Sequence, residues 1–334
     1  MNLLRLFLLL LVCTSCGSPS PDTQQRQQAL KQWHEQNGKP KVLSTIAMIN
    51  DLVKQIGAEH IDTLTLIQHE LDPHSYQLVK GDDEKLASAT LIFYNGLGLE
   101  HSPSIHHSLQ THANAVSLGQ YINQHHPELL LYYQNQVDPH IWMDISLWTK
   151  SVPAIVEALK FQDPNHADIY EKNGQLLIES LNQAHAEVHD QVQQIPDLKR
   201  YLITSHDAFN YFTRAYLATD AERQSNQWQQ RVAAPEGLSP ESQLNPHEIQ
   251  LIIDHMAKYN IHVIFPESNV SKDSIRKVVS AGKENGLNLI IADAILYADA
   301  MGKPGSNGDT YPKMIKHDAT ALHTWLTHPG NGSP

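Results

Sequence analysis

Residues 163–196 read DPNHADIYEKNGQLLIESLNQAHAEVHDQVQQIP, and this stretch decides how the rest of the chain is arranged. Its apolar residues recur at steps of seven, four, three, four and four, which places them on one face of a single α-helix. They are Tyr170, Leu177, Leu181, Ala184, Val188 and Val192. Asp163-Pro164 is a typical helix start and Ile195-Pro196 a typical stop. We therefore expect one helix over residues 164–195, roughly 40 Å long at about 1.5 Å per residue.

Apolar, β-branched runs that are typical of strands lie on both sides of this helix. The first series comprises Val42–Ile49, Ile61–Ile67, Thr90–Tyr94 and Ala115–Leu118, with helices predicted at Asn50–Gly57 and Asp82–Ser88. The second comprises Arg200–Ser205, His262–Pro266 and Asn288–Ala292, with helices at Pro246–Lys258 and Lys272–Asn285. Strands that alternate with helices indicate parallel sheets covered on both faces. The predicted fold class is α/β with two lobes, each a mostly parallel sheet flanked by helices. The long helix is either their rigid connector or an ordinary surface helix of one lobe.

The first residues indicate export. Arg5 precedes an apolar run, Leu6–Val12, that is too short to span a bilayer, and small residues follow it, as in a secretory signal peptide. Thr14-Ser15-Cys16 resembles a bacterial lipobox, although Cys13 stands where Leu is usual. We expect residues 1–15 to be removed, Cys16 to carry lipid, and the protein to be anchored in the periplasm or at the cell surface. Redox chemistry of the Cys13 and Cys16 pair is the alternative.

Composition and pattern set the remaining boundaries. Residues 16–40 are polar and rich in Gln, which predicts a tether, and the tail covers 329–334. The N-terminal lobe then covers 41–163 and the C-terminal lobe 196–328. With 36 acidic residues against 24 Lys and Arg, the net charge is −12, which argues against nucleic acid as a partner and is compatible with attracting cations. The number of histidines, 21, is the unusual feature of the composition. It is relevant to function because imidazole is a common ligand of transition metals.

Four segments carry side chains that suit a metal. Asp72-Pro73-His74, Ser205-His206 and Asp299 each lie beyond the end of a predicted strand, and Asp138-Pro139-His140 repeats the first motif in a loop that the pattern does not place. In open parallel sheets, ligands bind beyond the carboxyl ends of the strands. Facing lobes would bring three imidazoles and one carboxylate to one cleft, a set that suits zinc, manganese or iron and disfavours magnesium or calcium. Taken singly, each histidine fits an ordinary hydrogen-bonded loop residue equally well.

Together these motifs resemble the TroA-like solute-binding proteins of manganese, zinc and iron ABC transporters, over about residues 41–326. The resemblance is carried by Asp72–His74, Tyr94–Glu100, Asp138–Asp144, Ser205–Phe212 and Ala298–Gly302. It implies two α/β lobes joined by one long rigid helix, and one transported transition metal ion (Zn, Mn or Fe). The ligands that it implies are His74, His140, His206 and Asp299, a combination most similar to the TroA and YtgA branches. It further implies a monomer without enzymatic activity whose partners are an ABC permease and its ATPase.

Several other residues keep two interpretations. Glu267 ends a predicted strand and is a supporting residue, an alternative ligand or an ordinary loop residue. Asp144 and Asp207 either orient ligand histidines through the second ring nitrogen or cap helices. The histidines between 101 and 126 either collect metal or are surface residues; they are His101, His106, His107, His112, His125 and His126.

The segment Tyr94–Glu100 contains Gly96-x-Gly98 after a predicted strand. A dinucleotide fingerprint needs a third glycine, and His101 stands at that position. We therefore interpret this segment as a tight turn that leads into a helix.

Two other classes of function compete with metal transport. A secreted zinc hydrolase of the His-Glu-x-x-His type is disfavoured, because His69-Glu70 and His247-Glu248 both lack the second histidine. Four protein ligands would also fill the position that a catalytic zinc keeps open for water. A surface adhesin, in which metal only stabilises the fold, stays open as a second role.

Overall fold

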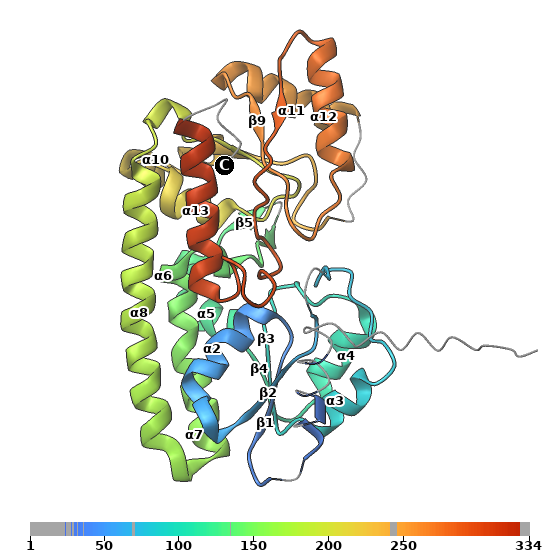
Figure 1. Ribbon diagram of the computed structural model, residues 1–334, viewed down its shortest axis with the longest axis vertical. Helices are drawn as coiled ribbons and strands as arrows, with labels where there is room; N and C mark the ends of the chain where they lie inside the picture. The colour runs from blue at the N-terminus through green and yellow to red at the C-terminus, as the bar shows by residue number, and fades with distance from the viewer. Residues whose placement is uncertain are drawn as a thin grey trace, which may run out of the picture.

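The computed structural model describes residues 24, 28, 30, 31, 33–35, 37–68, 71–133, 135–240 and 246–327. The predicted signal peptide, Cys16, most of the tether and the tail lie outside these residues. Within them, no helix combines the length and the apolar character that crossing a bilayer requires. The chain forms two α/β lobes stacked along the long axis of the molecule, with one long helix beside them (Figure 1), which confirms the predicted fold class.

The N-terminal lobe is built on a four-stranded parallel sheet with the strand order β2-β1-β3-β4. Its strands are β1 (Lys41–Ser44), β2 (Asp62–Thr65), β3 (Leu91–Tyr94) and β4 (Ala115–Ser117). The helices that alternate with them are α2 (Ala47–Gly57), α3 (Asp82–Ser88), α4 (Pro103–Thr111) and α5 (Leu118–His125). Central-strand residues such as Leu43 and Ile92 are fully buried, as expected for a sheet covered on both faces.

The predicted strand Val42–Ile49 is too long. Strand β1 ends at Ser44, and Ala47 already begins helix α2. The large apolar residues that α2 buries recur at alternating steps of one and three, as on a helix face; they are Met48, Ile49, Leu52, Val53 and Ile56. A short apolar run gives the same signal for a buried strand and a buried helix, so the pattern alone does not find this boundary.

A segment without predicted elements links the first sheet to the long helix. It begins with a small antiparallel hairpin of β5 (Tyr132–Tyr133) and β6 (Gln136–Val137). Helices α6 (Ile145–Trp148) and α7 (Val152–Gln162) follow. The Asp144 carboxylate accepts hydrogen bonds from the backbone N–H groups of Ser146 and Leu147, so Asp144 caps α6, one of its two predicted roles.

The long helix is α8 (Ala167–Gln193), with 27 residues. Every apolar residue predicted on its inner face is buried, and so is Gly174. A Cβ atom at Gly174 would lie 2.5 Å from Cγ2 of Val156, so glycine permits the close approach of α7. Helix α8 packs against α2 and α7 of the N-terminal lobe and against α13 (Tyr311–Thr327) at the end of the chain. It therefore runs along both lobes (Figure 1).

The C-terminal lobe contains two pairs of short parallel strands. These are β7 (Leu202–Ile203) with β8 (Val232–Ala233), and β9 (Val263–Ile264) with β10 (Ile290–Ile291). The N–H of Phe265 donates to the carbonyl of Ile203 at 2.8 Å, which joins the two pairs edge to edge. The helices of this lobe include α9 (Asn210–Phe212), α10 (Asp220–Ser225), α11 (Pro246–Tyr259) and α12 (Asp273–Glu284). Strand β8 was not predicted, because its two residues give no periodic signal.

Helix α13 is a second connection between the lobes. Its first residue, Tyr311, donates a backbone hydrogen bond to Asp51 of α2 at 3.0 Å and a hydroxyl hydrogen bond to the carbonyl of Trp142 at 2.5 Å. Further along, Lys316 pairs with Glu187 of α8 at 2.5 Å. One continuous cluster of buried apolar side chains includes residues from both lobes and from both of these helices. The two lobes are thus fixed to each other along one side of the molecule.

Candidate metal centre

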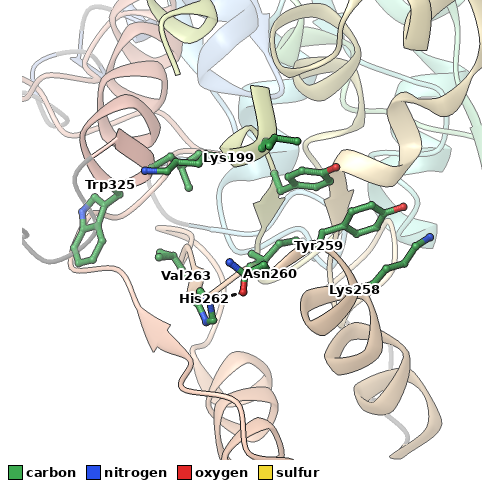
Figure 2. A pocket seen from close by; sticks show the side chains of 11 residues that line it. Lys199, Lys258, Tyr259, Asn260, His262, Val263 and Trp325 are labelled. Carbon is green, nitrogen blue, oxygen red and sulfur yellow. Dashed lines mark hydrogen bonds between the residues drawn. The ribbon is translucent and has the colours of Figure 1, made fainter. Parts of the chain in front are cut away.

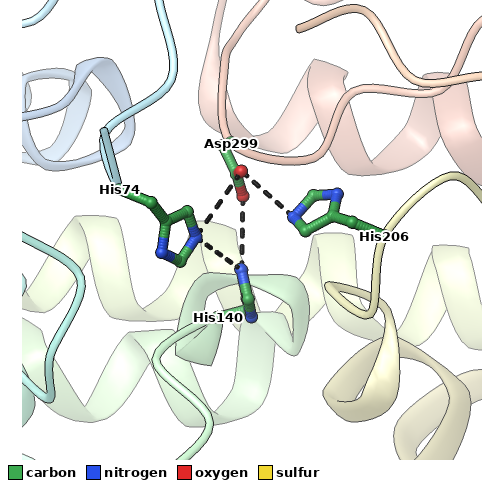
Figure 3. A group of neighbouring side chains, drawn as sticks. All are labelled: His74, His140, His206 and Asp299. Atoms are coloured by element: carbon green, nitrogen blue, oxygen red, sulfur yellow. Dashed lines mark hydrogen bonds and ion pairs between the residues drawn. The ribbon is translucent and has the colours of Figure 1, made fainter. Parts of the chain in front are cut away.

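The structure brings the four predicted ligands together between the lobes (Figure 3). His74 follows β2, His140 follows the β5–β6 hairpin, His206 lies beyond β7, and Asp299 lies beyond β10. The ligand atoms that they offer all lie within 4.8 Å of one another. All four side chains are buried, with exposed fractions of 3% or less. Two lobes therefore contribute to a single buried group of three imidazoles and one carboxylate.

The spacing of the ligand atoms fits a transition metal ion. Nε2 of His74 lies 3.2 Å from Nε2 of His140, and Oδ1 of Asp299 lies 3.5 Å from Nε2 of His140. Oδ2 of Asp299 lies 3.1 Å from Nε2 of His206 and 3.8 Å from Nε2 of His74. A tetrahedral ion with ligands about 2.0–2.1 Å away separates its ligand atoms by about 3.4 Å. The cluster is thus the right size for one such ion without a large rearrangement.

Two carboxylates behind the histidines fix which ring nitrogen faces the cluster. Oδ1 of Asp138 lies 2.7 Å from Nδ1 of His140, and Oε2 of Glu267 contacts Nδ1 of His206. A carboxylate accepts hydrogen bonds, so each Nδ1 carries the proton and each Nε2 presents its lone pair inward when the ring is neutral. Such carboxylate–histidine pairs are typical of metal sites, where they orient the ring and raise its basicity.

The backbone also holds these carboxylates in place. Oε1 of Glu267 accepts the N–H groups of Ser205 at 2.7 Å and His206 at 2.8 Å, so strand β9 supports the loop after β7. Oδ2 of Asp138 accepts a hydrogen bond from the Asn210 side chain at 3.0 Å. Glu267 is therefore a supporting residue of His206, one of the roles that the sequence left open.

The repeated Asp-Pro-His motif has a common backbone geometry. In both copies the aspartate Oδ1 accepts the N–H of the histidine two residues later, at 2.9 Å in Asp72–His74 and at 3.0 Å in Asp138–His140. Proline between them restricts the backbone, so the motif presents the imidazole from a stiff turn. This is the physical reason why the two tripeptides mark the site.

The electrostatics of the site set the protonation of the metal-free cluster. Burial lowers the pKa of His74 to about 3, so its ring is neutral. Burial alone would also lower the pKa of His206, but the Glu267 and Asp299 carboxylates outweigh it and raise that pKa well above its usual range. Burial alone would raise the pKa of Asp299, but the surrounding imidazoles, His206 foremost, hold it well below its usual range. A bound cation would thus take the place of a proton on His206.

The other candidates lie apart from the ligand atoms or support them. The hydrogen bonds of Asp207 run to Gly237 and Asn210 and do not orient a ligand ring. The Asn269 amide donates to Oδ2 of Asp299 at 3.2 Å, a contact that the sequence did not indicate. The sequence analysis did not predict that Asp138 orients the ring of His140. Its position in the same tripeptide as His140 was the feature that could have indicated this role.

A cleft of about 920 Å³ reaches the cluster at His74. Both lobes line it, with Leu97, His101 and Pro139 on one side and Leu238 on the other. His101 is exposed, and its ring centroid lies 6.1 Å from that of His74. This cleft is a path by which an ion can reach the buried ligands.

A second hollow, of about 470 Å³, lies between the ends of α11 and α13, and none of the four ligands lines it (Figure 2). Eleven side chains line it, mostly apolar or aromatic ones such as Tyr201, Tyr259 and Trp325, together with Lys199 and Lys258. Its one histidine, His262, pairs with Asn260 at 3.1 Å, and no acidic side chain lines it. This chemistry does not suit a metal ion, so the cluster between the lobes is the candidate site.

Comparison with known proteins finds relatives that are named for binding metal. The family described as zinc-uptake complex component A, periplasmic (ZnuA), matches residues 42–325. The metal-binding protein YtgA of Chlamydia trachomatis is 38% identical over 281 residues, which cover 84% of each chain. The manganese-binding lipoprotein MntA of Bacillus subtilis is 30% identical over 311 residues, 92% of this chain and 93% of that one. The zinc-binding protein TroA of Treponema pallidum is 31% identical over 287 residues, 86% of this chain and 88% of that one.

Solved structures give the same relationship. The crystal structure of Fe(III)-bound YtgA from Chlamydia trachomatis is similar with a TM-score of 0.81 and 34% identity, over 89% of this chain and all of that one. The periplasmic zinc-binding protein TroA from Treponema pallidum is similar with a TM-score of 0.77 and 30% identity, over 86% and 99%.

Proposed function

The chain belongs to the zinc-uptake complex component A family, and on this premise we propose that it is an extracytoplasmic solute-binding protein that captures one transition metal ion and delivers it to an ABC importer. Relatives are named as metal-, manganese- and zinc-binding proteins, and PsaA of Streptococcus pneumoniae as a manganese ABC transporter substrate-binding lipoprotein. The observation that carries the proposal is the buried group of three imidazoles and one carboxylate, drawn from both lobes.

In this proposal the ion is bound by Nε2 of His74, His140 and His206 and by the carboxylate of Asp299. The two oxygens of Asp299 face different histidines, so the carboxylate is able to bind through one oxygen or both. Three nitrogen ligands favour zinc, manganese or iron over magnesium and calcium. The ion is cargo, so the site must both bind it tightly and release it.

The charges around the site accommodate a trivalent ion as well as a divalent one. Asp299 supplies one negative charge directly, and Asp138 and Glu267 supply two more through His140 and His206. Further carboxylates, Asp72, Asp207 and Glu236, also interact electrostatically with residues of the site, so its surroundings favour a cation of either charge. The bound ion is therefore zinc, manganese or iron, and supply in the cell contributes to the choice.

We propose binding without catalysis. A catalytic zinc keeps one coordination position for water or substrate, whereas four protein ligands close a tetrahedral shell. The ligand atoms are also buried, so the bound ion offers little access to a second molecule. A hydrolase function therefore has no support from this arrangement.

Delivery requires the protein to stay near its importer. We propose a monomer whose partners are an ABC permease and its ATPase, held at the membrane by lipid on Cys16 after removal of residues 1–15. Residues 16–40 would form the tether, 41–163 the N-terminal lobe, 164–195 the connecting helix and 196–328 the C-terminal lobe. Intact mass of the protein from its native membrane should show a chain that begins at Cys16 with added acyl chains, which give stable anchoring. A chain that begins well after Cys16 and carries no lipid contradicts the anchor.

The experiment that tests the function is elemental analysis of the protein purified from its native host without added metal. The proposal predicts about one equivalent of zinc, manganese or iron per chain, and loss of that metal in a variant with His140 and His206 both replaced by Ala. A native protein that contains none of these metals contradicts the proposal.

A further inference from the structure

The Gly96-Leu97-Gly98 turn lies beside the metal centre and is held in an uncommon conformation. All three residues have positive φ angles, 74°, 55° and 88°, although Leu97 is not a glycine. The buried Glu100 holds the turn, because its Oε1 accepts the N–H of Asn95 and its Oε2 accepts the N–H of Gly96, both at 2.9 Å. A non-glycine residue stays in this region only where its surroundings impose it. The fold therefore fixes the position of this turn and of the residue that follows Glu100.

That residue is His101, and the turn sets the chemical state of its ring. Nδ1 of His101 lies 3.2 Å from the carbonyl oxygen of Gly98. A carbonyl only accepts hydrogen bonds, so Nδ1 carries the proton, and in the neutral ring Nε2 keeps its lone pair. His101 thus holds the tautomer that binds a metal through Nε2, as His140 does.

The position of His101 is between solvent and the buried cluster. Its side chain is exposed, whereas that of His74 is 3% exposed, and the two rings lie 6.1 Å apart between centroids. Both line the cleft of about 920 Å³ that reaches the cluster. An ion that enters through this cleft passes His101 before it reaches His74.

We propose that His101 is a capture ligand, which binds the hydrated ion in the cleft and passes it to His74. A bond from the metal to Nε2 of His101 forms as a water molecule leaves, and it breaks as the metal binds Nε2 of His74. No oxidation or proton transfer is required at His101. This inference rests on the proposed function, because it concerns the route into the same site.

A capture ligand has a kinetic signature that a resident ligand lacks. His101 is not one of the four residues whose ligand atoms lie within 4.8 Å of one another, so it does not bind the ion at equilibrium. It lowers the free-energy barrier for transfer of the ion between solvent and the buried site. The ion crosses this same barrier when it binds and when it is released. Removing it therefore slows association and release by the same factor and leaves the Kd unchanged.

The test uses His101→Ala and His101→Gln in the purified metal-free protein, with His106→Ala as a matched control. His106 is an exposed histidine on α4 whose Nε2 already pairs with Gln110. Glutamine at 101 keeps a donor for the Gly98 carbonyl but has no imidazole. Association of Zn²⁺ is followed by stopped flow near neutral pH, release is followed with excess chelator, and the Kd is obtained by competition.

We expect the association and release rate constants to fall by the same factor in both His101 variants. The Kd of both His101 variants should match that of the wild type. Both rate constants of the His106→Ala control should also match the wild type. Wild-type association and release rates in either His101→Ala or His101→Gln overturn the capture role. A higher Kd with an unchanged association rate also overturns it, because that result marks a residue that binds the ion at equilibrium. Failure of the wild type to bind any transition metal would refute the proposed function instead.

Discussion

Asp138 binds His140 twice, because its Oδ1 accepts both the backbone N–H of His140 at 3.0 Å and its ring Nδ1–H at 2.7 Å. One carboxylate oxygen therefore fixes the turn and the tautomer together. In the matching tripeptide, the Oδ1 of Asp72 accepts only the backbone N–H of His74. In one copy of the motif the aspartate thus holds both the backbone and the ring of its histidine, and in the other it holds the backbone.

Replacing Asp138 by Asn should weaken metal binding on the order of 10- to 100-fold, because the uncharged amide is a poorer acceptor and holds the ring of His140 less firmly. Competition titration with a zinc chelator measures the change. The exposed Glu187, which pairs with Lys316 far from the site, offers a matched control as Glu187→Gln. Equal affinities of the Asp138→Asn and Glu187→Gln proteins would show that the carboxylate behind His140 has no role in binding.

Replacing Glu267 by Gln should also weaken binding, through the tautomer of His206. The amide oxygen is still able to accept the N–H groups of Ser205 and His206, so the backbone should keep its geometry. The amide N–H₂ would then face Nδ1 and favour the tautomer with the proton on Nε2, where the metal binds. The expected result is a native thermal transition in the metal-free variant with a smaller metal-induced shift. A full metal-induced shift counts against this role of Glu267.

Metal should raise the melting temperature of the protein near pH 7.5, and this increase should be much smaller near pH 5. The raised folded-state pKa of His206 stabilises the metal-free protein below the unfolded pKa of about 6.5, and this contribution disappears as the pH rises through the folded-state value. Metal binding needs the neutral ring, so it has the opposite dependence and weakens as the pH falls. At a thousandfold excess of metal over Kd the stabilisation is about 4 kcal/mol. Differential scanning fluorimetry with and without Zn²⁺ measures it, and an equal shift at both pH values contradicts a three-histidine site.

The two lobes should move little when metal binds. Helices α8 and α13 run along both lobes, and Trp142 of the N-terminal lobe donates to the carbonyl of Ala298, next to Asp299, at 2.9 Å. Local shifts of the loops at His206 and Asp299 are expected instead. Small-angle scattering curves of the metal-free and loaded proteins should nearly superimpose. A large drop in radius of gyration on loading would refute a rigid connection.

The sequence predicted the elements whose pattern is long or repeated. The face of α8 that Leu177, Leu181 and Val188 form is fixed by helical periodicity, which extends over 27 residues and is hard to confuse with a strand. The two Asp-Pro-His tripeptides were found because the same three residues occur twice, and in both copies the backbone N–H of the histidine donates to the aspartate two residues before it. Both patterns involve residues that are close in the sequence, so they are recognised without knowledge of the three-dimensional structure.

The parts that sequence reasoning missed depend on contacts between distant residues. Helix α13 docks through Tyr311 onto Asp51 and Trp142, which lie far away in the chain. Glu267 reaches His206 only because β9 lies beside β7 in the sheet. Two-residue strands such as β8 contain too few side chains for a period, so only the neighbouring strand defines them.

The most direct test of the metal centre is titration calorimetry of six alanine variants with Zn²⁺ and Mn²⁺. Four of them remove the ligands His74, His140, His206 and Asp299, and two remove the exposed histidines His106 and His125 as controls. Each ligand variant should lose affinity or stoichiometry while the controls bind one ion as the wild type does. Loss of a histidine should affect zinc most, and loss of Asp299, the only charged ligand, should affect manganese more than zinc. If the four ligand variants keep wild-type affinity and stoichiometry, the ion does not bind between the lobes, and the account of this site is wrong.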